Sequence, residues 1–283
     1  MAVPPLRALV GAGHQVVLCV TRPDRRRGRG GALTPSPVAA AATELGLPVT
    51  HTMAEVAAAG VELAVVVAYG RIIPADLLAQ VPMVNLHFSL LPRWRGAAPV
   101  ERAILAGDAE TGVCLMKVEE GLDTGPVYAR AVVPIDDEID LATLRHQLVE
   151  VGTELLVRGL AGGLAGLGEP EPQHGEATSA DKITKEDLHL VWQTSAEALS
   201  RVVRLGQAWT TFRSKRLRVL SVAVEPATPG SVEPPGSLVG TAVATASGML
   251  RLIQVQPESR SPMSAEEWVR GVRPEQSERL GTE

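Results

Sequence analysis

The first two thirds of the chain alternate short runs of β-branched residues with longer stretches rich in Ala and Leu. This alternation is typical of a sheet of parallel strands joined by crossover helices. The β-branched runs predict strands over Gln15–Thr21, Pro48–Thr50, Leu63–Ala68, Met83–His87, Thr111–Val118 and Val127–Ile135. The Ala- and Leu-rich stretches predict helices over Val3–Ala12, Ser36–Gly46, Ala75–Gln80, Ala97–Ala106 and Ala142–Leu160. We therefore expect an α/β domain over residues 1–168.

A change in composition predicts a second domain. Between Gly168 and Glu186 the chain is rich in Gly, Pro, Glu and Thr and has little periodicity, which indicates a linker over residues 169–186. A predicted helix over Ser195–Leu205 is then followed by short strands separated by Pro and Gly clusters. This pattern is typical of a small β-barrel or sandwich, which we place at residues 187–283.

The charge is distributed unevenly. The net charge of -5 argues against sequence-blind binding of nucleic acid, but it permits a local basic patch. Five arginines lie between Arg22 and Gly30 with only Asp24 to oppose them, and six basic residues without any acid lie between Arg201 and Arg218. A single basic run is most simply interpreted as a solvent-exposed surface of the protein. Two such runs in an acidic chain favour binding to a polyanionic partner.

Other features bound the class of protein. The chain has no apolar run long enough to span a bilayer and no start resembling a signal peptide, so we expect a cytoplasmic protein. We also expect it to act as a monomer. Cys19 and Cys114 each lie in a β-type apolar run, which predicts buried, reduced thiols. No His or Cys cluster has the spacing of metal ligands, and no Gly-rich phosphate loop is present.

Asn85 and His87 are the first candidates for chemistry. Two positions apart in the strand Met83–His87, they project from the same face at the point where the strand ends. Ligands of open α/β sheets bind at that end. An amide and an imidazole there can donate hydrogen bonds to a carbonyl oxygen as it becomes an oxyanion, which acyl transfer requires. The alternative is that both simply cap the strand.

Asp123 is the second candidate. It lies in the Gly-flanked turn Gly121–Gly125, between two predicted strands. An Asp in such a turn commonly serves only the turn itself. A carboxylate that orients His87 and helps to remove a proton from an attacking amine would instead complete a site for acyl transfer.

Together these residues resemble the signature of the 10-formyltetrahydrofolate-dependent formyltransferase family. The resemblance lies in Asn85, His87 and Asp123, with Ser89–Pro92, Arg93–Pro99 and Gly121–Gly125 around them. It implies a Rossmann-like parallel-sheet formyltransferase domain, followed by a small OB-like β-barrel domain. It also implies a transferase that takes its formyl group from the reduced folate 10-formyltetrahydrofolate and needs no metal.

The resemblance assigns roles position by position. Asn85 and His87 would bind and polarise the formyl oxygen, and Asp123 would orient His87 and assist removal of the amine proton. The folate would be lined by four consecutive residues, Ser89, Leu90, Leu91 and Pro92.

The acceptor depends on features outside the signature. The Arg-rich insertion and the segments Leu33–Pro37, Lys182–Asp187, Ala208–Phe212 and Met263–Trp268 are similar to the tRNA-acting members of the family. This implies initiator methionyl-tRNA as acceptor, with the loop Pro23–Pro35 entering its acceptor end, Arg29 as the leading contact, and the C-terminal domain along its backbone. Two alternatives remain: a formyltransferase acting on a nucleotide-linked amino sugar, and an inactive RNA-binding remnant.

One departure from the family motivates the last alternative. The family's opening strand and its Gly-Thr-Pro turn should precede Ala2, and the strand should lie between Gln15–Thr21 and Leu63–Ala68. Either the start is assigned too late or the chain is a defective copy. A central strand is covered on both faces, so we expect the chain as given to be poorly soluble or inactive.

Overall fold

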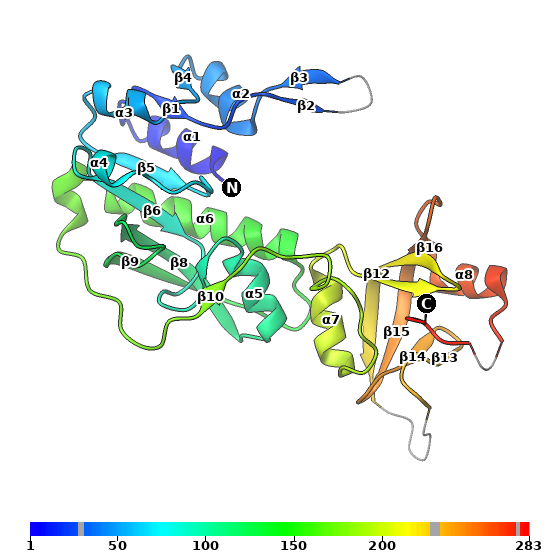
Figure 1. Ribbon diagram of the computed structural model, residues 1–283. Coiled ribbons are helices and arrows are strands. Elements are labelled where there is room, and N and C mark those ends of the chain that lie inside the picture. Colours follow the sequence, from blue (N-terminus) through cyan, green and yellow to red (C-terminus); the bar gives the residue numbers. More distant parts are fainter. Residues whose placement is uncertain (28–30, 227–232, 276–277, 283) are drawn as a thin grey trace. The chain divides into compact units, whose positions relative to one another are not determined.

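The computed structural model describes residues 1–27, 31–226, 233–275 and 278–282, apart from the Arg27 side chain (Figure 1). The chain forms two compact units. The first comprises Met1–Val100, Glu110–Pro134 and Arg145–Asp181, and the second Glu101–Ala109, Ile135–Leu144 and Lys182–Glu283. Within the described residues, no helix is both long and apolar enough to cross a membrane. The predicted boundaries at residues 168 and 187 stay predictions.

The first unit contains a four-stranded sheet in the order β5 (Ala64–Val67), β6 (Met83–His87), β8 (Glu110–Lys117) and β9 (Val127–Pro134). β5 and β6 are parallel, whereas β6 and β8, and β8 and β9, are antiparallel. The α/β prediction is therefore confirmed, and the antiparallel strands refine it. β8 and β9 are joined by a short turn, which leaves no room for the long crossover that a parallel connection needs.

Helices cover this sheet and complete its core. The long helix α6 (Leu141–Gly159) has fully buried leucines at 144, 148 and 156. Added Cβ atoms at Gly152 and Gly159 would lie 3.1 Å from a Val113 methyl group and 2.8 Å from a Leu115 methyl group, so these glycines let the helix approach β8 closely. η1 (Gly163–Leu167) adds the buried Leu167, and α5 (Pro99–Ala106) continues from this unit into the second, where Ile104 is fully buried.

The amino-terminal part of the first unit has its own sheet, distinct from the four-stranded sheet. It has a two-stranded parallel sheet of β1 (Cys19–Val20) and β4 (Val49–Thr50), with the helices α1 (Val3–Gly11) and α2 (Pro37–Glu44). Two short helices follow, α3 (Ala54–Ala58) and α4 (Ala75–Leu78), of which sequence patterns predicted only α4. The run predicted as a loop at residues 23–35 contains a hairpin of β2 (Arg25–Arg27) and β3 (Ala32–Thr34). Cys19 is buried, as predicted.

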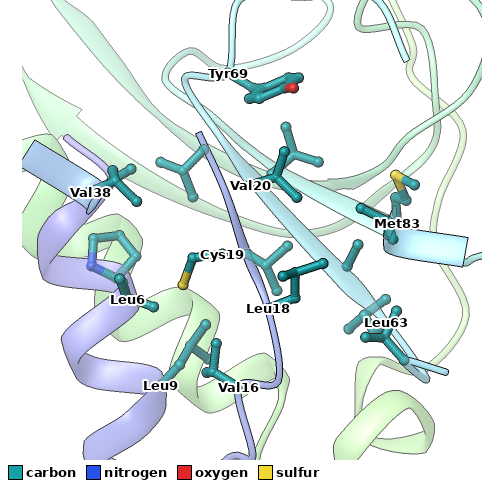
Figure 2. A pocket seen from close by; sticks show the side chains of 18 of the residues that line it. Leu6, Leu9, Val16, Leu18, Cys19, Val20, Val38, Leu63, Tyr69 and Met83 are labelled. Atoms are coloured by element: carbon teal, nitrogen blue, oxygen red, sulfur yellow. The ribbon is translucent and has the colours of Figure 1, made fainter. Parts of the chain in front are cut away.

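An apolar slot separates β1 from β5. Among the described residues these two strands are not hydrogen-bonded to each other, and a cavity of about 830 Å³ lies against both of them (Figure 2). Its lining includes side chains of α1, β1 and β5, such as Leu6, Leu9, Cys19, Val20 and Val65. Protein interiors rarely leave voids larger than a water molecule. The predicted strand Gln15–Thr21 is shortened to Cys19–Val20, because β1 has a hydrogen-bonded neighbour only at β4.

The second unit is dominated by an antiparallel sheet. Its path is β11 (Trp209–Phe212), β12 (Lys215–Glu225), β15 (Met249–Pro257), β14 (Ala242–Ala244) and β13 (Leu238–Val239), and β16 (Met263–Ser264) also pairs with β15. Its core joins these strands to α7 (Ala196–Arg204) and α8 (Ala265–Val272) through residues such as Leu199, Leu250 and Trp268. No pairing among the described residues joins β13 back to β11.

Both α7 and α8 begin with a capping serine, although only α7 was predicted from the sequence. Ser195 caps α7, where its side chain accepts a hydrogen bond from the Ala198 amide, and Ser264 and Glu267 form a capping box on α8. Each cap satisfies backbone amides that the first turn leaves without partners. The predicted helix Ser195–Leu205 is thus confirmed as α7 with its cap.

The slot generates a test of stability. Residues 1 to 3 line this cavity, so an extension before Met1 would begin beside it. We expect six Val and Ile residues, joined to Met1 through a Gly-containing turn, to form a strand there. Burying one such side chain contributes about 1.5 to 3 kcal/mol, so the unfolding midpoint should rise by about 10 °C or more. Calorimetry against an extension of six Ser and Asn residues is the comparison, and equal midpoints would show that the slot accepts no strand.

Candidate active site

The site begins at the end of β6. Asn85 is paired with Val66 of β5 and with Met116 of β8, and His87 is paired with Cys114 of β8. Their side chains lie on the same face of the sheet because they are two positions apart. His87 is 5% exposed, so its ring is held within the protein. Burial raises the pKa of the Cys114 thiol beneath it, which keeps that thiol protonated and unreactive.

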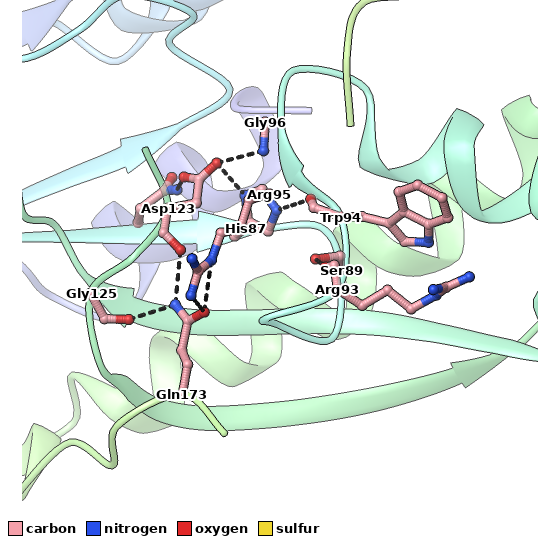
Figure 3. A network of polar contacts seen from close by, with 10 residues as sticks. His87, Ser89, Arg93, Trp94, Arg95, Gly96, Asp123, Gly125 and Gln173 are labelled. Carbon is pink, nitrogen blue, oxygen red and sulfur yellow. Dashed lines mark hydrogen bonds and ion pairs between the residues drawn. The ribbon is translucent and has the colours of Figure 1, made fainter. Parts of the chain in front are cut away.

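Asp123 joins these two residues from the turn between β8 and β9 (Figure 3). Its Oδ1 lies 3.5 Å from Asn85 Nδ2, and its Oδ2 lies 3.5 Å from His87 Nδ1. Oδ2 also accepts a 2.9 Å hydrogen bond from the amide of Gly96. The three residues that the sequence selected are therefore brought together, from two separate segments of the chain.

A backbone carbonyl holds the other side of the His87 ring. Nε2 lies 2.8 Å from the carbonyl oxygen of Trp94. Because a carbonyl oxygen can only accept, Nε2 carries the hydrogen of this bond. Nδ1 is then the nitrogen that faces Asp123 and can engage a substrate.

The turn around Asp123 is tightly constrained. Asp123 has φ of 52°, in the left-handed region that non-glycine residues seldom occupy. An added Cβ at Gly125 would lie 2.0 Å from the Lys117 carbonyl oxygen, so this position has no room for a side chain. The local sequence thus suits a turn that presents one carboxylate.

Gln173 and Arg95 complete the network. Arg95 lies in the signature segment Arg93–Pro99 without an assigned role, and sequence analysis did not select Gln173. Gln173 Nε2 donates 2.8 Å hydrogen bonds to the backbone oxygens of Asp123 and Gly125. Its Oε1 accepts from Arg95 Nε at 3.1 Å and from Arg95 Nη2 at 2.7 Å. Gln173 lies in the stretch predicted as a linker, where no periodic pattern marked it.

The predicted folate-lining residues are only partly accessible. Ser89 is fully buried and donates a 2.6 Å hydrogen bond to the Arg93 carbonyl, and Leu91 is 3% exposed. Leu90 and Pro92 are partly exposed. The folate-lining role of these four residues stays a prediction, and the side chains of Leu90 and Pro92 are the more available for it. The described residues contain no cluster of three metal-ligating side chains.

The two basic runs differ in how free their charges are. Arg29 lies outside the described residues, and Arg25 and Arg26 are exposed on the β2–β3 hairpin. In the second run several arginines bind within their own unit. Arg201 donates to the Leu105 carbonyl, Arg204 to the Asp136 carbonyl, Arg213 to Glu278 and Arg218 to Gln256. Lys215 and Arg216 are exposed.

Comparison with known proteins places the chain in a family. Residues 6–160 match the family described as formyl transferase, and residues 182–273 match the family described as formyl transferase, C-terminal domain. The chain therefore belongs to the formyl transferase family.

Its similarity within that family extends over almost the whole chain. Methionyl-tRNA formyltransferase of Thermus thermophilus is 44% identical, with 99% of this chain and 96% of that protein covered. Methionyl-tRNA formyltransferase of Paenarthrobacter aurescens is 43% identical, with 96% and 94% covered.

A solved structure shows a similar fold. It is the N-formyltransferase from Helicobacter canadensis in complex with folinic acid and dTDP-3-aminofucose, which aligns with a TM-score of 0.66 over 89% of this chain and 95% of that chain. Its sequence identity is 16%, so the similarity concerns the fold alone.

The turn around Asp123 provides a test of the site's construction. We expect Gly125→Ala to lower the free energy of unfolding by about 1 to 3 kcal/mol, because its Cβ would meet the Lys117 carbonyl at 2.0 Å. Gly11→Ala at the end of α1 is the control, since nothing lies within 4 Å of its added Cβ. Urea unfolding of both variants measures the difference. If Gly125→Ala were as stable as the control, the turn would not be constrained as described.

Proposed function

We propose that this protein transfers the formyl group of 10-formyltetrahydrofolate to the free amino group of methionine on initiator methionyl-tRNA. The product is N-formylmethionyl-tRNA for translation initiation. The observation that carries the proposal is the convergence of Asn85, His87 and Asp123 at the end of β6, in a chain similar over nearly its full length to methionyl-tRNA formyltransferases. A folate site also agrees with the folinic acid bound by the Helicobacter canadensis protein of similar fold.

The reaction places specific demands on the three side chains. The methionine nitrogen forms a bond to the formyl carbon, the bond from that carbon to N10 of the folate breaks, and the proton lost by the amine ends on the folate nitrogen. Negative charge develops on the formyl oxygen along the way. The Asn85 amide can donate to that oxygen, and so can His87 when Nδ1 carries a proton. Donors held in place before the reaction lower the barrier most.

Asp123 serves both the imidazole and the proton. Its Oδ2 lies 3.5 Å from His87 Nδ1 and is held at 2.9 Å by the Gly96 amide. The carboxylate therefore orients the ring, and it can accept a proton from the attacking amine. The reaction needs no group beyond these side chains and the two substrates.

The basic hairpin supports a tRNA acceptor. Arg25 and Arg26 are exposed on β2, and Figure 1 shows β2 and β3 extending away from the helices beside them. An extended basic element suits a long phosphate backbone better than a compact nucleotide sugar, because each phosphate contact adds electrostatic affinity. In the second unit, the exposed Lys215 and Arg216 provide further positive charge on β12.

Several finer features belong to the same proposal. We propose that the antiparallel sheet of the second unit is an OB-like barrel that binds the tRNA backbone. The domains run over residues 1–168 and 187–283, and the protein acts as a cytoplasmic monomer. Sedimentation at micromolar concentration tests the monomer, since a mass of twice 29.8 kDa would contradict it.

The catalytic assignment predicts large losses of turnover. In a chain extended upstream by a first strand, Asn85→Ala, His87→Ala and Asp123→Ala should each lower kcat by several orders of magnitude while the fold persists, because removing one oxyanion donor alone costs roughly 100- to 1,000-fold. Circular dichroism checks the fold and transfer of labelled formyl to methionyl-tRNA measures the rate. His146→Ala is the control, since that histidine is exposed on α6. Wild-type turnover in any one of the three variants would contradict its role.

The hairpin predicts a change in binding rather than in chemistry. Replacing Arg26, Arg27 and Arg29 with Ala should weaken tRNA binding and lower the salt slope of log Kd by about one for each lost phosphate contact. Arg7→Ala on α1 is the control, because Arg7 pairs with Glu44 away from the hairpin sequence. Filter binding over a range of salt concentrations gives both quantities. An unchanged slope would mean that the hairpin is only a solvated surface.

A further inference from the structure

We propose that Gln173 is a positioning residue for Asp123, which makes the predicted linker a working part of the site; this inference rests on the proposed function. Gln173 touches the backbone of the Asp123 turn and not the reacting atoms. Its Nε2 donates to the backbone oxygens of Asp123 and Gly125, each at 2.8 Å, so both hydrogens of the amide are used on one turn.

Arg95 fixes the orientation of the amide. Its Nε and Nη2 both donate to Gln173 Oε1, at 3.1 and 2.7 Å. If the amide were reversed, its oxygen would face two carbonyl oxygens and its nitrogen would face a guanidinium group. A glutamate at this position would keep the contact with Arg95 but place an acceptor against both carbonyls, so the position requires an amide.

The backbone of Asp123 needs such support. Its φ of 52° lies in the left-handed region, where a residue with a side chain is strained. The Gly96 amide holds the carboxylate from one side, and Gln173 holds the backbone carbonyl from the other. Together these contacts determine where Oδ1 and Oδ2 lie relative to Asn85 and His87.

Gln173 lies in the segment of residues 171–180, which is hydrogen-bonded to the rest of the first unit at both ends. Figure 3 shows Gln173 within the network of polar contacts. Glu171 exchanges two backbone hydrogen bonds with Val127, at 2.8 and 2.9 Å. At the other end, β10 (Ser179–Ala180) pairs with β7 (Arg95–Gly96). An added Cβ at Gly96 would lie 2.9 Å from the Ala180 carbonyl oxygen, which shows how closely the two segments approach.

The same segment also supports the residue that holds His87. The Trp94 amide donates to Thr178 Oγ1 at 2.9 Å, and the Trp94 carbonyl accepts from His87 Nε2 at 2.8 Å. The acid and the imidazole are thus positioned from one stretch of chain. A stretch that served only to join two domains would not need these contacts.

The expected effect of losing Gln173 is on the chemical step. Gln173→Ala and Gln173→Glu should each lower kcat by about 10- to 100-fold, because small errors in the position of a catalytic group cost on this scale. The KM for methionyl-tRNA should change less than twofold. Gln80→Ala is the control, because Gln80 is exposed and bonds only its own helix turn at the Asp76 carbonyl.

A double-mutant cycle separates positioning from general support. If Gln173 acts through Asp123, then adding Gln173→Ala to Asp123→Ala should lower the residual single-turnover rate no further. Should the full 10- to 100-fold loss persist in that background, the proposal is overturned. It is also overturned if Gln173→Ala and Gln173→Glu both keep the wild-type kcat, or if both lose activity only by unfolding in a thermal melt.

The outcomes distinguish this inference from the function on which it rests. If the wild-type protein, extended upstream of Met1 by a first strand, transfers no formyl group to methionyl-tRNA, the proposed function fails. If the wild type is active and Asp123→Ala is impaired while both Gln173 variants are not, only the assignment of Gln173 fails.

Discussion

The position of one carboxylate organises the whole candidate site. Asp123 Oδ2 accepts the Gly96 amide at 2.9 Å and lies 3.5 Å from His87 Nδ1, while Oδ1 lies 3.5 Å from Asn85 Nδ2. Each partner comes from a different local structure: Gly96 from the short strand β7, His87 from the end of β6 and Asn85 from its interior. Other features around the site, from the absence of a side chain at Gly125 to the amide of Gln173, keep that carboxylate where these groups can meet it.

Local patterns predicted the parts of the site that depend on local structure. A strand of five residues sets Asn85 and His87 on one face by its twofold period, and the Gly-flanked turn marks Asp123 as the carboxylate between two strands. The contacts of Gln173 are different, because they join residues about 50 positions apart in sequence and follow no period. The same holds for the hairpin of β2 and β3 and for α3, which are too short to leave a clear pattern.

The basic run of the second unit shows how charge in a sequence differs from charge available on a surface. The side-chain hydrogen bonds of Arg213 lower the pKa of Glu278 to about 2, so this pair stays ionised at neutral pH and cancels one positive charge. Arg201 and Arg204 donate to backbone carbonyls and so contribute to structure as well. On β12 the exposed basic side chains are those of Lys215 and Arg216. The Arg216 guanidinium lies 4.7 Å from the centre of the Trp209 ring.

The slot beside β5 connects stability to the site. β5 is hydrogen-bonded to β6 on one side, and the apolar cavity lies along the other. Val66 of β5 is the register partner of Asn85, so movement of β5 toward the cavity would be transmitted directly to the amide that is proposed to bind the formyl oxygen. Among the described residues His87 has no register partner on β5, and it pairs with the fully buried Cys114 of β8. Of the two donors on β6, Asn85 is therefore the one whose position depends on how the slot is filled.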